Sequence, residues 1–253
     1  MINVILSGCN GRMGDVLSLL CAEHPDITVV AGFDVNTAAP FGYPVFSSPD
    51  DFSGEADVII DFSNVLALPA LFGYALRTKT PVVLATTGLD DKLNAMVNKA
   101  SESIAIFKSA NMSLGINVLC ELVRQATAIF GDAYDIEIIE KHHNKKLDAP
   151  SGTALMLADA ASSALPYKAE YTYDRSRERK MRSKQEIGIS AIRGGTIVGQ
   201  HDVLFAGHNE VVTLSHEAQS REVFAAGAVK AALFLAGQAP GLYAMSDLVA
   251  KYL

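Results

Sequence analysis

The first 34 residues constrain the fold more than any other part of the chain. Residues 1–6 form a short apolar run that predicts a buried parallel strand, and a glycine-rich turn follows it. Apolar residues at helical spacing come next, and a second apolar run over residues 27–33 ends at Asp34. Strand, glycine turn, helix, strand and acid in this order predict a dinucleotide-binding unit.

Glycine recurs at every third position of the turn, at Gly8, Gly11 and Gly14. Glycine permits a tight turn, close approach of the backbone to a pyrophosphate, and close packing of the helix on the strand. The helix N-terminus would then face the phosphate charge. The spacing is G-x-x-G-x-x-G rather than the commoner G-x-G-x-x-G. The three cysteines are interpreted as ordinary reduced thiols, and Cys9, within this turn, is the candidate among them for modest reactivity.

Asp34 lies twenty residues after Gly14, where a dinucleotide fold places the acid that accepts from the ribose 2′-hydroxyl. The alternative is that Asp34 is a turn residue, as aspartate often is. Val35 and Asn36 follow it, so no neighbouring cation holds a 2′-phosphate. This favours NADH over NADPH, although Arg12 could still reach a phosphate and NADPH stays possible.

Further strands are predicted over residues 57–62, 81–88 and 104–107, with helices over 65–77 and 90–101 between them. This alternation predicts an α/β fold with a Rossmann-type, doubly wound parallel sheet. Ligands of such sheets bind just beyond the carboxyl ends of the strands. Besides Asp34, the residues predicted at these ends are Gly8–Met13, Asp61–Asn64, Ala85–Gly88 and Ser109–Met112.

The pattern changes after a long helix predicted over residues 113–130. A strand over 134–140 follows, and three runs rich in β-branched residues predict consecutive strands of an antiparallel or mixed sheet. These runs are 186–193, 196–206 and 210–217, with a last helix over 221–236. We therefore predict a first domain, residues 1–113 plus 222–253, and a second α+β domain, residues 114–221. The charged run 175–184 is interpreted as a solvated loop or a subunit contact.

A second informative segment is Glu140-Lys-His-His-Asn-Lys-Lys-Leu-Asp-Ala-Pro-Ser-Gly-Thr-Ala154. Lysine and histidine supply cationic donors, and a helix start after the proline supplies free backbone N–H groups. Histidine also exchanges a proton near neutral pH. The segment predicts a site for a small, multiply negative substrate; the alternative is a solvated basic loop. A metal site is disfavoured, because adjacent histidines rarely face one ion and the lysines would repel it.

The composition excludes several classes of protein. The 253 residues are 49% hydrophobic and 19% charged, which suits a folded core. A net charge of −7 argues against nucleic acid or an anionic membrane as partner. The apolar runs are too short to span a membrane, and the first residues predict a strand rather than a signal peptide. Three scattered cysteines make neither a disulfide framework nor a zinc site, so we expect a cytoplasmic protein.

Together these motifs resemble the 4-hydroxy-tetrahydrodipicolinate reductase (dihydrodipicolinate reductase) family over essentially the whole chain. The resemblance rests on the glycine turn, Ala85-Thr-Thr-Gly88, Ser109-Ala-Asn-Met112 and the 140–154 segment. It also extends to Arg193-Gly-Gly and to residues 220–228. It implies that NADH or NADPH reduces a cyclic, unsaturated dicarboxylate to tetrahydrodipicolinate in the diaminopimelate and lysine pathway. It further implies a dinucleotide domain, a substrate domain and a homotetramer formed by the substrate domain.

The resemblance also implies roles for individual residues. His142 corresponds to the family's proton donor/acceptor and Lys146 to its second proton donor, whereas Lys145 is interpreted as solvated. The implied substrate contacts are His143, Ser151, Gly152 and Thr153. The implied nucleotide contacts are Gly8, Cys9, Asn10, Gly11, Arg12, Met13, Asp34, Ala85, Thr86, Thr87, Ser109, Ala110, Asn111 and Met112. Some members carry a basic residue directly after the acidic ribose ligand, and Val35 departs from that pattern.

Two other functions stay open at this point. A different nicotinamide-dependent dehydrogenase of a small anionic substrate, such as a semialdehyde, would share the first domain but not need the dense cationic segment. A non-catalytic NAD-sensing module would bind the nucleotide without turnover, and replacing Lys146 would leave its function intact. Substrate testing separates the first alternative from the reductase, and turnover separates the second.

Overall fold

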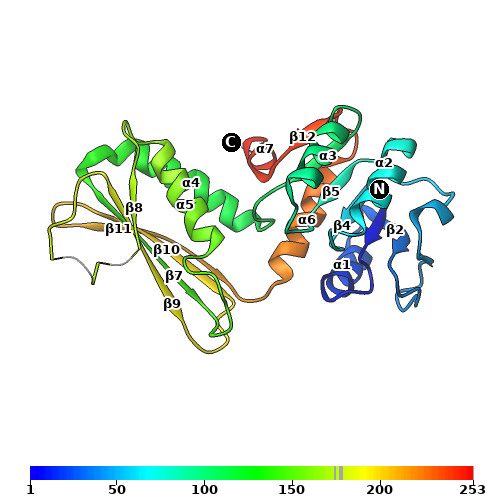
Figure 1. Cartoon of the computed structure of the whole chain (residues 1–253), viewed down its shortest axis with the longest axis horizontal. Helices are drawn as coiled ribbons and strands as arrows, with labels where there is room; N and C mark the ends of the chain where they lie inside the picture. Colours follow the sequence, from blue (N-terminus) through cyan, green and yellow to red (C-terminus); the bar gives the residue numbers. More distant parts are fainter. Residues whose placement is uncertain (174, 177–178, 253) are drawn as a thin grey trace. The chain divides into compact units, whose positions relative to one another are not determined.

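The computed structural model describes residues 1–173, 175–176 and 179–252 (Figure 1). The chain divides into two compact units, one made of Met1–Leu114 with Glu222–Leu253 and the other of Gly115–Arg221. The second unit is therefore a single insertion into the first.

A seven-stranded sheet in the order β12-β6-β5-β4-β1-β2-β3 forms the centre of the first unit. Its strands are β1 (Ile2–Ser7), β2 (Ile27–Phe33), β3 (Val45–Phe46), β4 (Val58–Asp61), β5 (Val82–Leu84), β6 (Ala105–Lys108) and β12 (Gly241–Tyr243). Every neighbouring pair is parallel. The predicted Rossmann-type, doubly wound parallel sheet is confirmed.

Helices cover both faces of this sheet, and the alternation of side chains along β1 shows why. Val4 and Leu6 belong to one apolar cluster, whereas Ile5 belongs to the cluster on the opposite face. The first cluster includes α1 (Arg12–Glu23), α6 (Glu222–Leu235) and α7 (Met245–Ala250). The second includes α2 (Leu68–Thr78) and α3 (Asp91–Ser101). Because β1 is apolar on both sides, it can only be stable as an inner strand of such a layered unit.

The strand order changes direction between β1 and β4. From β1 the chain adds β2 and β3 on one side, and β4, β5, β6 and β12 on the other. The carboxyl ends of β1 and β4 lie side by side, since Ser7 pairs with Asp61. A crevice at such a switch point is where open α/β sheets bind ligands. The polar residues that follow these strands are therefore gathered at one edge of the sheet.

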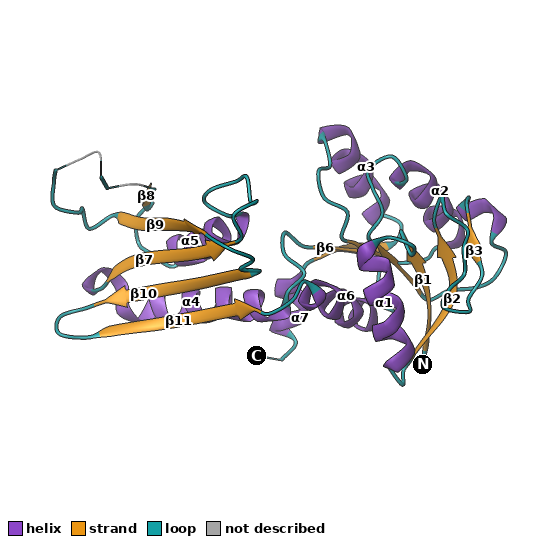
Figure 2. Ribbon diagram, turned by 90° about the horizontal axis from the view of Figure 1, so that it is seen from below, coloured by secondary structure: helices purple, strands orange, loops and turns teal. Residues whose placement is uncertain are grey.

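The second unit contains a five-stranded mixed sheet in the order β11-β10-β7-β9-β8. Its strands are β7 (Asp135–His142), β8 (Glu170–Thr172), β9 (Glu186–Arg193), β10 (Gly199–Ala206) and β11 (Val211–Ala218). β7 pairs antiparallel with β10 and parallel with β9. Helices α4 (Leu114–Phe130) and α5 (Gly152–Ser163) lie on one side of this sheet (Figure 2). The prediction of an antiparallel or mixed sheet in an α+β unit is confirmed.

The sequence interpretation overlooked short elements. Strands β3, β8 and β12 have two or three residues each, and two short 3₁₀ turns occur at Pro49–Asp51 and Gly131–Ala133. The described residues of the charged run 175–184 are exposed, as expected of a solvated loop, except for Arg182. Arg182 is 17% exposed, pairs with Asp135, and donates to the carbonyl oxygens of Ile136 and Glu186. Within that run, Arg177 and Glu178 lie outside the described residues.

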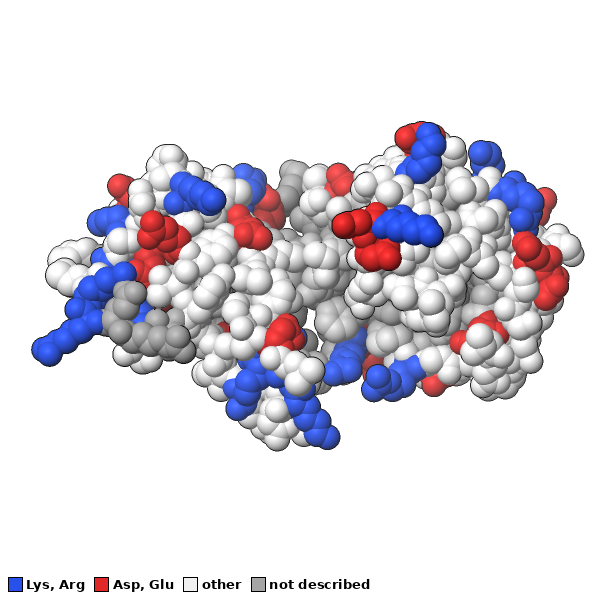
Figure 3. Space-filling view, viewed as in Figure 1, with Lys and Arg blue, Asp and Glu red and all other residues white. Residues whose placement is uncertain are grey.

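Among the helices of the described residues, none combines the length and apolar character that crossing a lipid bilayer requires. On the face shown in Figure 3, lysine and arginine side chains of the described residues are interspersed with aspartate and glutamate.

Candidate functional site

A cavity of about 470 Å³ lies at the carboxyl edge of the seven-stranded sheet, next to the β1–β4 switch point. It is lined by Ser7, Gly8, Gly11, Phe33, Asp34, Val35, Ser47, Pro49, Phe62, Ser63, Asn64, Leu66, Ala67, Ala70 and Leu71. Apolar walls with a few polar groups are typical of a small-molecule site. Three of the residues predicted to contact a nucleotide, Gly8, Gly11 and Asp34, therefore line one cavity.

The glycine turn needs glycine for steric reasons that the structure makes explicit. Gly8 has φ of +76°, and a Cβ there would lie 2.7 Å from the carbonyl oxygen of Phe62. A Cβ on Gly14 would lie 2.2 Å from the carbonyl oxygen of Cys9. Helix α1 begins at Arg12, so its first N–H groups, which lack intrahelical acceptors, belong to this turn. The turn thus has the close backbone approach and the helix start that a pyrophosphate site needs.

Asp34 is held in place by backbone donors. Its carboxylate accepts from the N–H of Asn10 at 3.0 Å and from the N–H of Asn36 at 3.0 Å. The Asn10 amide in turn donates to the carbonyl oxygens of Asn36 at 2.5 Å and Ala38 at 2.8 Å. Each carboxylate oxygen keeps a further lone pair for a ligand hydroxyl. Val35, which follows, lines the cavity and is 93% exposed.

Other predicted nucleotide contacts turn their side chains into the protein. Cys9 is fully buried, and burial, helped by the charge of Asp34, raises the pKa of its thiol to about 11. The expectation that Cys9 is modestly reactive is therefore wrong. Thr86 donates to the buried Asp61 carboxylate at 2.6 Å, and Met112 is 5% exposed in the core. Ser109 donates to the carbonyl oxygen of Asn111 at 3.1 Å.

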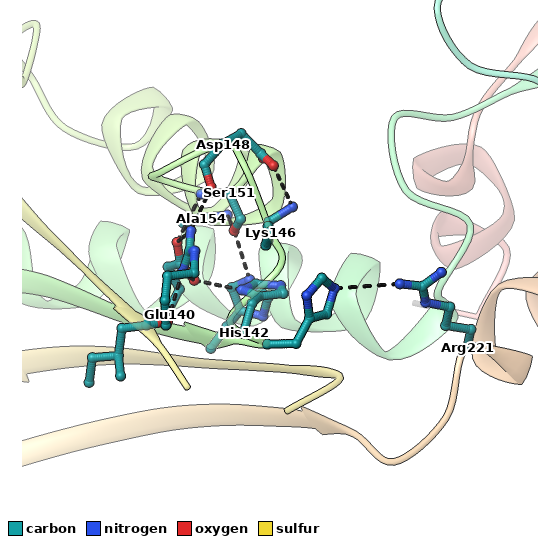
Figure 4. Close-up of polar contacts among 11 residues, drawn as sticks. Glu140, His142, Lys146, Asp148, Ser151, Ala154 and Arg221 are labelled. Carbon is teal, nitrogen blue, oxygen red and sulfur yellow. Dashed lines mark hydrogen bonds and ion pairs between the residues drawn. The ribbon is translucent and has the colours of Figure 1, made fainter. Parts of the chain in front are cut away.

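In the second unit, the basic segment is anchored at both ends (Figure 4). Strand β7 continues to His142, two residues beyond the predicted end. Its alternating burial places Glu140 and His142 on the helix-covered side. At the far end, Ser151 caps helix α5, because its hydroxyl accepts from the N–H of Ala154 at 3.1 Å. Gly152 and Thr153 form the first turn of that helix.

Glu140 is the fully buried centre of this site. Its carboxylate accepts two hydrogen bonds from the Arg193 guanidinium, both at 2.7 Å, and one from the N–H of Ser151 at 3.0 Å. His142 Nδ1 lies 2.6 Å from Glu140 Oε2. Burial alone would raise the pKa of Glu140, but the hydrogen bonds from Arg193 and His142 outweigh it and lower the pKa. Glu140 is therefore ionised.

His142 and His201 are neutral at neutral pH, because burial lowers the pKa of both rings. Burial lowers the pKa of His142, although the Glu140 carboxylate opposes the shift. The ring of His201 lies edge-on to that of His142, with centroids 5.1 Å apart, and its Nε2 is 3.1 Å from the Ser151 hydroxyl. Burial, with the nearby His142, lowers the pKa of His201 to about 4.

The cations of this site lie on the loop and at the end of the unit. Lys146 Nζ is 2.9 Å from Asp148 Oδ1, and its side chain is 22% exposed. The hydrogen bond from Lys146 lowers the pKa of Asp148. His143 Nε2 lies 3.5 Å from the Arg221 guanidinium. The structure thus brings His142, Lys146 and Ser151 together around the start of α5, on an acidic protein.

Comparison with known proteins agrees with this geometry. The family description "Dihydrodipicolinate reductase, N-terminus" matches residues 2–112, and "Dihydrodipicolinate reductase, C-terminus" matches residues 115–249.

The chain belongs to the dihydrodipicolinate reductase family.

Relatives match over nearly their whole length. A 4-hydroxy-tetrahydrodipicolinate reductase of Caldanaerobacter subterraneus subsp. tengcongensis is 57% identical over 251 residues, covering 99% of each chain. One of Clostridium tetani is 47% identical and covers 98% of this chain and 97% of its own. A dipicolinate-bound dihydrodipicolinate reductase from Paenisporosarcina sp. TG-14 superposes with a TM-score of 0.81, covering 98% of this chain and 99% of its own. At 23% identity, that likeness shows a shared fold.

The predicted site residues do not include three residues that the structure places in this candidate site. Glu140 is only the first residue of the basic segment, and Arg193 lies 53 residues away at the end of β9. His201 lies in β10, and its ring contacts both His142 and Ser151. One signal was available for Arg193, because a cation directly before Gly194-Gly195 ends a strand beside β7. Among the described residues, no group of three or more His, Cys, Asp or Glu is placed to hold a metal ion.

Proposed function

We propose that this protein reduces 4-hydroxy-tetrahydrodipicolinate to tetrahydrodipicolinate, with NADH or NADPH as reductant, in diaminopimelate and lysine biosynthesis. In the balanced reaction one hydride and one proton are added to the substrate, and one water leaves. Relatives at 57% and 47% identity are named 4-hydroxy-tetrahydrodipicolinate reductase. The observation that carries the proposal is the anchored basic loop, in which Lys146 and His142 lie at the start of α5.

The substrate is a dicarboxylate, and the start of α5 suits one of its carboxylates. The first N–H groups of a helix lack intrahelical acceptors and carry partial positive charge, so they bind anions. We propose that Ser151, Gly152 and Thr153 contact one substrate carboxylate there. His143, whose Nε2 faces the Arg221 guanidinium, is proposed as a further substrate contact. Lys146 adds a full positive charge to the same site.

Proton transfer is proposed for Lys146 and His142. Hydride addition leaves negative charge on the conjugated ring, so a proton must reach the adjacent atom. An ammonium aimed at that atom both stabilises the charge and supplies the proton. Lys146 fits this role, because it is half-buried and its partner Asp148 has a lowered pKa and stays ionised. His142 is the proposed proton donor/acceptor, and Lys146 is the second proton donor.

The first unit is proposed to hold the nucleotide, which supplies the hydride when it is bound. We propose that Gly8–Met13 contact the pyrophosphate and Asp34 the ribose. Residues at the ends of β5 and β6 are proposed to contact the nicotinamide end: Ala85, Thr86, Thr87, Ser109, Ala110, Asn111 and Met112. Because the side chains of Cys9, Thr86 and Met112 are buried in the protein, we propose that these residues contact the nucleotide through their backbone groups. The fit is supported by the steric closeness at Gly8 and Gly14 and by the fixed Asp34 carboxylate.

NADH is proposed as the preferred reductant. A ribose 2′-hydroxyl can donate to the Asp34 carboxylate, whereas a 2′-phosphate would meet like charge there. Val35, exposed beside it, offers no cation. Arg12 is exposed at the start of α1, so NADPH stays possible as a weaker reductant.

A homotetramer and a cytoplasmic location complete the proposal. In the second unit, α4 and α5 cover only one side of the sheet. On the other side Ile192 is 46% exposed and Val211 58% exposed. Exposed apolar side chains on an open sheet face suit a subunit interface. Size-exclusion chromatography with light scattering tests this: a mass four times that of the chain supports the tetramer, and a monomer contradicts it.

The reductase itself is tested by following nicotinamide absorbance. The substrate is made in situ from pyruvate and aspartate semialdehyde by the preceding synthase. Oxidation of NADH that requires the synthase supports the reductase, and the ratio of NADH to NADPH rates tests the reductant preference. No oxidation with either nucleotide, given measured binding, would contradict the proposed function and favour an NAD-sensing module.

A further inference from the structure

Arg193 and Glu140 form an ion pair that joins two parallel strands under the proposed proton-transfer site. In the β7–β9 register Arg193 lies opposite His142, and its guanidinium reaches back to Glu140. Both hydrogen bonds are 2.7 Å, so the pair is bidentate. Glu140 is fully buried, and the Arg193 side chain is 20% exposed. The planar guanidinium binds the carboxylate through both of its Nη atoms, and the two parallel hydrogen bonds fix the orientation of the Glu140 carboxylate.

The pair determines which ring nitrogen of His142 carries hydrogen. An ionised carboxylate can only accept hydrogen bonds, so His142 Nδ1, at 2.6 Å from Glu140 Oε2, must be the donor. A neutral imidazole has one N–H, and His142 is neutral because burial lowers its pKa. Nε2 is therefore a bare acceptor. A Cβ built on Gly199 of β10 would lie 3.1 Å from that nitrogen, so glycine leaves it room.

The same pair also holds the loop that carries Lys146. The Arg193 guanidinium donates to the carbonyl oxygen of Asp148 at 2.6 Å. Glu140 accepts from the N–H of Ser151 at 3.0 Å. The carboxylate of Asp148 also forms an ion pair with the ammonium of Lys146, with 2.9 Å between Oδ1 and Nζ. The position of Lys146 therefore depends on a backbone that Arg193 and Glu140 hold at two points.

We propose that Arg193 and Glu140 are positioning residues that keep His142 in its Nδ1–H form with Nε2 as a proton acceptor and hold the Lys146 loop against β7. His142 then accepts a proton or hydrogen bond at Nε2, and Lys146 gives the proton. The inference deepens the proposed function and rests on it for the activity measurement only.

The charged and titratable groups around His142 come from four elements. Glu140 faces it from its own strand, Arg193 from β9 and His201 from β10, while Lys146 acts on it from the loop. Lys146 and Arg193 both disfavour an imidazolium at this position, and Glu140 is the one acid among them in direct contact with the ring.

The first experiment reads the tautomer in the wild-type protein without any substrate. Ring-nitrogen shifts of ¹⁵N-labelled histidine are recorded at pH 7.5, and His142 is assigned by the signals that disappear in His142→Asn. The expected result is a protonated Nδ1 and an unprotonated Nε2. The reverse pattern overturns the inference, whatever the activity of the protein.

The second experiment compares Glu140→Gln and Arg193→Lys with Asp202→Asn. The amide introduced by Glu140→Gln can donate a hydrogen bond from its NH₂ group to His142 and so reverse the tautomer of the ring. The ammonium introduced by Arg193→Lys keeps the positive charge but cannot form the two parallel hydrogen bonds of the guanidinium. We expect kcat to fall about tenfold to hundredfold in both variants, as loss of an orienting partner does. NADH affinity should stay unchanged, because the nucleotide residues are in the other unit. Asp202→Asn breaks the Lys141 pair on the opposite side of the same strand and should keep wild-type kcat.

The outcomes separate the two claims. Wild-type kcat in folded Glu140→Gln and Arg193→Lys, with an unchanged His142 spectrum, overturns the positioning role. A purely structural pair would lower the midpoint of urea unfolding but leave kcat per folded molecule unchanged. An inactive wild type overturns the proposed function, and the ring-nitrogen spectrum still decides the tautomer. Should Glu140→Gln fail to fold, Arg193→Lys and the wild-type spectrum carry the test.

Discussion

The Thr86 hydroxyl donates a hydrogen bond of 2.6 Å to the carboxylate of Asp61, which is fully buried. The Ser63 hydroxyl donates to the same carboxylate at 2.6 Å. Asp61 ends β4, and Thr86 follows the neighbouring strand β5. The Thr86 hydrogen bond therefore ties the carboxyl ends of two strands together beside the cavity at the switch point. A residue that sequence reasoning assigned to the cofactor uses its side chain to hold the sheet.

Thr86→Val is expected to lower the free energy of unfolding by about 1–3 kcal/mol, because it removes one hydrogen-bond donor from a fully buried carboxylate. Thr87→Val is the matched control, because Thr87 is the next residue and is exposed, and the substitution changes the side chain in the same way. Urea unfolding followed by circular dichroism measures both. Equal midpoints for the two variants would show that the Asp61 contact contributes nothing to stability.

Asp61→Asn tests the same site through its pH dependence. Burial raises the pKa of Asp61, although hydrogen bonds from Ser63 and Thr86 oppose the shift. The folded state then binds a proton more readily than the unfolded state, so this group destabilises the protein as pH rises from the unfolded pKa toward the folded one. The free energy of unfolding of wild type relative to Asp61→Asn should therefore decrease as the pH rises above the unfolded pKa of about 4. Urea midpoints at several pH values measure it, and a difference that does not change with pH contradicts it.

The cysteines are expected to be inert in the folded protein. Burial raises the pKa of Cys9 to about 11, of Cys21 to about 12 and of Cys120 to about 11. Because the thiolate is the reactive form, iodoacetamide at pH 8 should label Cys9 only slowly without urea and rapidly in urea. Peptide mass spectrometry resolves the three sites. Fast labelling of native Cys9 would mean that the glycine turn opens.

Local patterns explain how much of the first unit could be predicted. The strand over 27–33 was predicted with its observed bounds, because an apolar run bounded by polar residues is visible within one window. Strand β12 was not, since three residues beside Pro240 show no periodicity and become a strand only by pairing with β6. Cys9 shows the same limit, because its place in the turn was readable but its burial depends on distant Gly32 and Tyr43.

The site in the second unit was half predictable for a related reason. His142 and Lys146 stand out because unusual residues cluster within a few positions. The strand that carries His142 was ended too early, since Lys141 and His142 do not look like strand residues although β9 and β10 flank them. Arg193 meets Glu140 only through the β7–β9 register, and no local pattern contains a contact across 53 residues.

Asp34→Ala is expected to weaken NADH binding much more than NADPH binding. Only NADH presents a 2′-hydroxyl for the carboxylate, and removing the negative charge relieves repulsion of a 2′-phosphate. Titration of nicotinamide fluorescence gives both dissociation constants. Asn36→Ala is the control, because it keeps the backbone N–H that binds Asp34 and removes an exposed side chain whose hydrogen bond, from the N–H of Ala38 at 3.1 Å, does not involve Asp34. Equal weakening of both nucleotides would count against the ribose assignment.

Lys146→Ala is expected to lower turnover by at least about a hundredfold, as loss of a general acid does, while NADH binding persists. Lys145→Ala is the control. Lys145 is exposed and precedes Lys146 directly, so this variant loses the same charge at a different position. Comparing the two variants therefore separates the effect of position from the effect of net charge. Lys146 differs from Lys145 in its ion pair with Asp148 and in its burial against the loop that Arg193 holds. If turnover depended only on the positive field of the loop, both variants would lose activity to a similar degree. A loss of activity confined to Lys146→Ala would show that position matters. If the single-turnover rate of this variant, measured by stopped flow, fell as much as its steady-state turnover, the defect would lie in the chemical step rather than in product release.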